Sequence, residues 1–152
     1  MKRIVKTSLV LAAFAAVAIT TSMHTLGALH AQDYRPAITM AQLQGSWQMT
    51  LIGNTGCGFT SMLVNVTMNG AGTGTANWAG HSAGCGDGQT SGHPFVIQSL
   101  NPNGSGTANL SCGTACGWEF NIQVAPDRDI FNVVDVTPAN GGNFLEGTAI
   151  RQ

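Results

Sequence analysis

Turn-forming sequences recur every eight to fourteen residues along most of this 152-residue chain, and this spacing limits the fold more than any other feature. Several of the short segments between the turns alternate apolar and polar residues with the period of two that half-buried strands show. In one of them, Trp118, Phe120 and Ile122 share a face opposite Glu119 and Asn121. Such spacing is typical of an all-β sandwich or barrel, and the length suffices for one domain. The eight predicted strands cover residues 46–53, 59–69, 73–80, 94–101, 105–112, 116–125, 129–136 and 144–151.

The connections between these strands alternate between two kinds. The second, fourth and sixth are compact turns, at Asn69-Gly70, Pro102-Asn103-Gly104 and Pro126-Asp127-Arg128-Asp129. The first, third, fifth and seventh are longer and rich in glycine, at residues 54–58, 81–92, 112–116 and 137–143. If each strand pairs with the next, all the longer loops lie at one end. The sequence therefore predicts an eight-stranded antiparallel up-and-down barrel with a closed base and a loop-rich mouth.

The first 31 residues have the composition of a secretory signal peptide. Lys2, Arg3 and Lys6 form a positive start, an apolar run follows over residues 9–19, and small residues precede a cleavage site after Ala31, with Ala28 as the alternative. The apolar run is shorter than the roughly 20 residues that a membrane-spanning helix needs. We therefore expect an exported protein, periplasmic or secreted, without a stable membrane anchor after cleavage.

These features divide the chain into three parts. Residues 1–31 are the predicted signal peptide, residues 32–44 a tail, and residues 45–152 the barrel domain. The tail is expected to contain one short helical turn from Thr39 to Leu43, because threonine is a favoured residue for capping the start of a helix.

The charge of the mature chain differs from that of the whole sequence. Three of the six basic residues lie in the signal peptide while all seven acidic residues follow it, so the remaining formal charge is −4 and no lysine is left. Nucleic-acid binding needs a basic patch that displaces counterions from phosphates. Three dispersed arginines form no such patch, so we expect no nucleic-acid partner.

All four cysteines follow the signal peptide, and an even number of cysteines in an exported chain predicts disulfides. Three pairings are open, and we favour Cys57–Cys85 with Cys112–Cys116 because the second pair encloses only three residues. A zinc site made of four thiolates is an alternative, but it requires two closely spaced pairs.

Gly45-Ser46-Trp47 at the start of the first strand, the eight-stranded meander and Arg151 at the end of the last strand resemble the calycin pattern of lipocalins and avidins. The resemblance implies that Trp47 packs against Arg151 at the base of the barrel, in a cation–π contact. The aromatic residue that avidins have in the third strand would fall near Ala76, so biotin binding is not predicted.

The inner faces of the third, fifth and eighth strands carry small residues, and these predict space inside the barrel. They are Gly74, Ala76, Gly106, Ala108, Gly147 and Ala149. An eight-stranded barrel is just wide enough to be filled by side chains or to hold one small ligand, and both outcomes stay open. The residues predicted to line a ligand cavity are Met62, Val64, Trp78, Leu110, Trp118, Phe120 and Leu145.

The leading hypothesis is an exported barrel that binds a small apolar or amphipathic ligand at its loop-rich end. The alternative is a non-catalytic structural module that forms a homo-oligomer through the outward residues Phe59, Leu63, Val96 and Phe144. A third hypothesis is an enzyme or metal protein that uses three residues of one connection, His81, Asp87 and His93. Their spacing is irregular, so no catalytic residue, metal ligand or cofactor is predicted.

Overall fold

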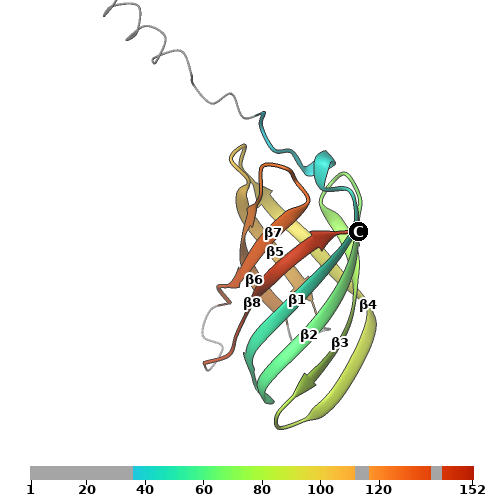
Figure 1. Cartoon of the computed structure of the whole chain (residues 1–152), viewed down its shortest axis with the longest axis vertical. Helices are drawn as coiled ribbons and strands as arrows, with labels where there is room; N and C mark the ends of the chain where they lie inside the picture. Colours follow the sequence, from blue (N-terminus) through green and yellow to red (C-terminus); the bar gives the residue numbers. More distant parts are fainter. Residues whose placement is uncertain (1–35, 112–116, 138–141) are drawn as a thin grey trace, which may run out of the picture. The chain divides into compact units, whose positions relative to one another are not determined.

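Eight antiparallel strands form a closed barrel in which each strand pairs with the next and β8 pairs with β1 (Figure 1). This strand order confirms the all-β up-and-down barrel predicted from the turn spacing. The computed structural model describes residues 36–111, 117–137 and 142–152. The predicted signal peptide, Cys112 and Cys116 lie outside the described residues. The strands are β1 (Gly45–Thr55), β2 (Gly58–Met68), β3 (Thr73–Ser82), β4 (Gly86–Leu100), β5 (Ser105–Ser111), β6 (Gly117–Val124), β7 (Ile130–Asp135) and β8 (Phe144–Arg151).

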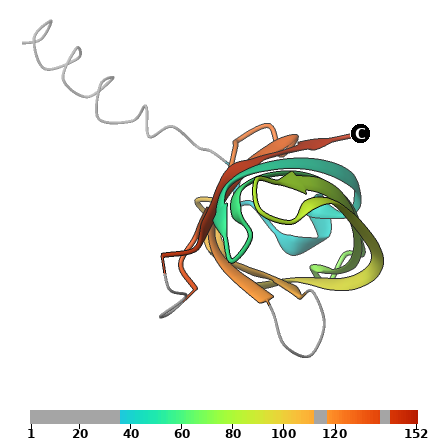
Figure 2. The same cartoon turned by 90° about the horizontal axis from the view of Figure 1, so that it is seen from below.

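A single turn of 3-10 helix, η1 (Met40–Leu43), precedes the first strand, as the sequence predicted. Thr39 is its N-cap, and the Gln42 side chain accepts a hydrogen bond from the Thr39 N–H at 2.9 Å. Viewed along the barrel, η1 lies across the end opposite the β1–β2 and β3–β4 turns (Figure 2). Leu43 is fully buried, so η1 closes the base with an apolar side chain. Within the described residues, no helix is long and apolar enough to cross a membrane.

The core lies inside the barrel and follows the period-two alternation of the strands. In β2, every second residue from Thr60 to Met68 is buried and the residues between them are exposed. The same alternation holds in β1 and β6, whose inward side chains interdigitate in the lumen. The largest fully buried side chains of the core are Trp47, Phe95, Phe120, Phe131, Leu43, Met49, Leu51, Leu110 and Leu145.

Trp47 and Arg151 meet at the base, as the calycin resemblance implies. The Arg151 guanidinium carbon lies 4.7 Å from the Trp47 ring centroid, and the Trp47 indole N–H donates to the carbonyl of Leu43 at 2.9 Å. Arg151 also donates to the carbonyls of Gln44 and Gln42. A cation–π contact of this kind contributes about 0.5–2 kcal/mol. One side chain therefore holds η1, β1 and β8 together.

The connection predicted as a long loop at residues 81–92 is instead a β-hairpin, and this corrects the sequence analysis. β3 continues to Ser82 and β4 begins at Gly86, with His81 opposite Asp87 in the register. The ladder shifts register between Ala76 and Trp78, so the two strands pair on both sides of an irregularity. The many glycines in residues 81–92 suggested a loop. Glycine within a strand also marks bulges, and that is its role in this hairpin.

A disulfide joins the tips of the two hairpins at the mouth. Cys57, in the turn between β1 and β2, is bonded to Cys85, in the turn between β3 and β4. This is the predicted pairing for these two cysteines. Gly84 N–H also donates to the Cys57 carbonyl at 2.8 Å, so the backbones of the two turns are in contact as well.

The inward glycines have a different role from the one expected of them. A Cβ atom on Gly147 would lie 1.8 Å from the Thr50 carbonyl oxygen, and one on Gly106 would lie 2.1 Å from that of Ser99. Glycine at these positions lets neighbouring backbones approach closely where a barrel sheet bends. These residues therefore serve strand curvature and do not by themselves provide space for a ligand.

Candidate functional site at the mouth of the barrel

A hollow of about 330 Å³ opens at the disulfide-linked end of the barrel. Its volume is at the lower end of the range for small-molecule sites, roughly 300–1,000 Å³. β1, β2, β3, β4 and β6 supply its walls, and both cysteines of the Cys57–Cys85 bridge are among them. The lining residues are Thr55, Gly56, Cys57, Thr60, Met62, Trp78, Gly80, Ser82, Cys85, Gly86, Asp87, Gly88 and Trp118.

Two tryptophans and one methionine form the apolar part of this hollow. Trp78 and Trp118 are half-buried and pack against the core, so each presents part of its ring to the opening. Met62 is buried, with 5% of its surface exposed. The Trp78 indole nitrogen is buried and has no hydrogen-bond partner among the described residues. Aromatic rings of this kind give a ligand a large contact area.

Glycines keep one wall of the hollow flat. Gly80 and Gly88 are paired across β3 and β4, and both line the hollow. A Cβ atom on Gly88 would lie 3.6 Å from the Trp78 ring, so this ring covers the backbone of β4. The lack of side chains at Gly80 and Gly88 leaves room for the Trp78 ring on this wall.

Hydroxyl groups form the polar part of the hollow. Thr60 is the buried polar residue of this region, and its Oγ1 lies 2.8 Å from Thr55 Oγ1 and 3.0 Å from Ser82 Oγ. Thr60 also donates to the Gly58 carbonyl at 3.0 Å. These hydroxyls form hydrogen bonds to each other and to the backbone. The bonds fix the positions of the three side chains on one wall of the hollow and leave the hydroxyls satisfied within the protein.

The predicted cavity residues divide into two groups in the structure. Met62, Trp78 and Trp118 line the hollow. The other four are fully buried core residues and do not line it: Val64, Leu110, Phe120 and Leu145. The alternative of a filled core thus holds for the lower part of the barrel, while an open space exists at the mouth.

Ser82, Gly86 and Gly88 of the hollow were not predicted, because residues 81–92 were assigned to a loop. The signal that finds them is the continuation of the period-two pattern of β3. Trp78, Gly80 and Ser82 are every second residue, and they share the inner face. The pairing with Gly86 and Gly88 then follows from the register.

His81, Asp87 and His93 do not form one cluster. His81 Nδ1 lies 2.8 Å from Asp87 Oδ1, and both side chains are largely exposed, at 65% and 94%. His93 instead contacts Thr90, with Nε2 2.7 Å from the hydroxyl oxygen. Among the described residues, no group of three or more His, Cys, Asp or Glu side chains is arranged to hold a metal ion.

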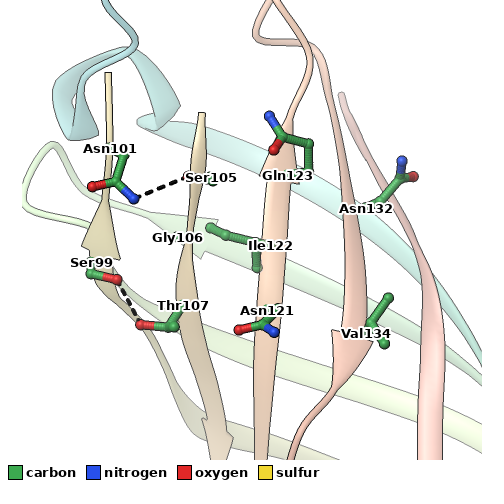
Figure 3. Close-up of a pocket in the computed structure, with 10 residues that line it drawn as sticks. All are labelled: Ser99, Asn101, Ser105, Gly106, Thr107, Asn121, Ile122, Gln123, Asn132 and Val134. Carbon is green, nitrogen blue, oxygen red and sulfur yellow. Dashed lines mark hydrogen bonds between the residues drawn. The ribbon is translucent and has the colours of Figure 1, made fainter. Parts of the chain in front are cut away.

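A second hollow, of about 500 Å³, is a shallow groove on the outer side of β4 to β7 (Figure 3). Uncharged polar side chains dominate its lining. Several of them are already paired, as in Ser99 with Thr107 at 2.8 Å and Asn101 with Ser105 at 3.0 Å. Figure 3 shows the labelled side chains spread over neighbouring strands without converging on a point. This groove is a weaker candidate for a small-molecule site than the mouth.

The outer side of the strands that follow this groove around the barrel is more apolar. All the large hydrophobic residues that are exposed in the described part of the chain lie on β1, β2, β7, β8 or directly after β7. Phe59, Leu63 and Phe144, three of the residues predicted to face outward, are among them, whereas Val96 is half-buried on β4. The full set is Ile52, Phe59, Leu63, Ile130, Val134, Val136, Phe144 and Ile150, which we call the apolar face.

Comparison with known proteins assigns no function to this chain. No family model matches the chain, and no curated protein matches it. A solved structure that it resembles is that of an S-type phycobiliprotein lyase from Guillardia theta. The two chains are 12% identical over 74% of this chain and 90% of that one, with a TM-score of 0.36. An identity this low says nothing about the ligand or activity of this chain.

Proposed function

We propose that this chain is exported and that its barrel binds a small apolar or amphipathic ligand at the mouth, without catalysing a reaction. The observation that carries the proposal is the hollow lined by Trp78, Trp118 and Met62 at the end of an otherwise filled barrel. Concave, mostly apolar sites with a few polar groups are where proteins bind small molecules. The signal-like start of the sequence and the Cys57–Cys85 disulfide support export.

The dimensions of the hollow limit the ligand. A volume of about 330 Å³ suits a molecule of two or three rings rather than a long lipid chain. Because Trp78 and Trp118 lie on β3 and β6, a flat ligand between them would contact two different parts of the wall. Stacking on such rings contributes about 0.5–1.5 kcal/mol per aromatic pair beyond burial.

Titration with the neutral fluorescent probe N-phenyl-1-naphthylamine tests this function. We expect saturable binding, and we expect Trp118→Leu and Trp78→Leu each to weaken it about tenfold, because each removes an aromatic wall. Ile150→Ala is the control, since Ile150 is exposed on the outside of β8 and should leave affinity unchanged. The absence of saturable binding, or equal affinity in the tryptophan variants, would contradict the proposal.

The apolar face favours a second candidate function, self-association. Glu146 is the only charged side chain that β1, β2, β7 and β8 direct outward, so the face combines exposed hydrophobic residues with little charge. Apolar patches of this kind are typical of protein interaction sites.

Sedimentation velocity tests this second function. A dimer or larger assembly is expected for the native chain, and Ile52→Asp combined with Phe144→Asp should convert it to monomer by placing charges in the contact. Asn121→Asp adds a charge to the polar groove instead and should not change the assembly. A native chain that stays monomeric at high concentration would rule out this function.

A further inference from the structure

We propose that the mouth selects ligands that carry a positive charge: small amines or quaternary ammonium compounds with a flat apolar body. This inference rests on the proposed ligand-binding function and assigns a chemical class to the ligand. Three observations carry it: the distribution of charged residues between the two ends of the barrel, the tryptophan rings in the hollow, and the carboxylate at its rim.

Opposite charges balance at the base of the barrel. Arg128, Asp127 and Asp129 lie in the turn between β6 and β7, and Arg151 ends β8. The Arg151 side chain lies 3.0 Å from the Asp129 carboxylate. Two arginines and two aspartates thus leave this end with no excess charge.

The mouth, in contrast, has four acidic residues, one histidine (His81) and no arginine or lysine among the described residues. Asp87 and Glu119 lie near the start of β4 and β6, Asp135 ends β7, and Glu146 is near the start of β8. Since even-numbered strands begin at the mouth and odd-numbered strands end there, all four belong to that end. The sequences of 112–116 and 138–141 contain no charged residue. The excess negative charge of the barrel domain therefore lies at the mouth, where it attracts cations.

The acidic groups differ in how far they are neutralised. Asp135 accepts hydrogen bonds from Thr137 through Oδ1, while its Oδ2 is buried without a hydrogen-bond partner in the described structure. Asp87 is paired only with His81 in the contacts described, and its carboxylate is almost fully exposed. No arginine or lysine side chain of the described chain is available at this end to hold an anionic head group.

The walls of the hollow favour the same charge. Trp78 and Trp118 line the hollow, and a cation seated over an indole ring is attracted by the ring's electron density. Asp87 borders the hollow, and its carboxylate, which lies on the outer face beside His81, adds negative charge near the rim. A cationic head group gains from the ring contacts and from this nearby charge, whereas an anionic one is repelled by both.

Three ligands that share one ring system test the inference: 1-naphthylmethylammonium, 1-naphthalenemethanol and 1-naphthoate, measured by calorimetry at low salt. We expect the cation to bind at least about tenfold more tightly than the anion, with the neutral alcohol between them. The difference should shrink in 1 M salt, where the screening length falls to about 3 Å.

Two matched variants locate the effect. Asp87→Asn should weaken binding of the cation severalfold and leave the alcohol unchanged, while Asp127→Asn, at the base, should alter neither. If all three ligands bind with similar affinity, the charge preference is wrong and ligand binding at the mouth stands. If none of them binds, the proposed function and the charge preference both fail.

Discussion

Replacing Gly147 with alanine is expected to destabilise the barrel by at least about 3 kcal/mol, because the new methyl group has no room at the seam that closes the sheet. Gly147 pairs with Leu51 between β8 and β1. A Cβ atom there would lie 1.8 Å from the Thr50 carbonyl oxygen and 2.9 Å from its carbon. Both are backbone atoms, so a change of side-chain rotamer cannot relieve the clash and the two strands must separate.

Urea denaturation followed by tryptophan fluorescence measures this loss, and Gly56→Ala provides the matched control. No atom lies within 4 Å of a Cβ built on Gly56, so this variant should stay within about 0.5 kcal/mol of the native protein. A native stability of about 5–15 kcal/mol is typical of a domain, so the Gly147 variant loses a large share of it. Equal urea midpoints for the Gly147→Ala and Gly56→Ala variants would show that β1 and β8 have room for a methyl group at this position.

The strand order was predictable because the signals that determine it are local. Alternating residues in β2 and β6 mark their inner faces, and turns such as Asn69-Gly70 mark their ends. With eight strands and short connections, an up-and-down meander follows, and the parity of the turns then assigns each loop to an end. Cys57 and Cys85 fell at the same end by this reasoning, and they are bonded.

The details of the site were not predictable in the same way, because they depend on contacts between strands. The glycines of β4 resembled a loop, and only the register with β3 shows that Gly88 lies opposite Gly80. The depth of the hollow depends on how large side chains such as Phe120 and Leu145 fill the lumen together. Alternation identifies inward residues, but it does not say which of them meet a neighbour and which meet open space.

Removing the Cys57–Cys85 bridge is expected to have the second large effect. The two cysteines are 28 residues apart, and cross-linking a loop of this length stabilises a protein by roughly 3–4 kcal/mol, mainly by restricting the unfolded chain. We therefore expect Cys57→Ala combined with Cys85→Ala to lower the free energy of unfolding by that amount. Because both cysteines line the hollow, affinity for N-phenyl-1-naphthylamine should fall as well.

The control for this variant is Cys112→Ala combined with Cys116→Ala, which removes the other predicted bridge. That loop encloses only three residues, so its loss should cost about 2 kcal/mol or less by the same loop entropy. Both cysteines lie outside the described residues, so this variant is a control for stability alone. Equal losses of stability in the two double variants would contradict the loop-length argument. Unchanged probe affinity without the Cys57–Cys85 bridge would mean that the bridge stabilises the fold but does not shape the hollow.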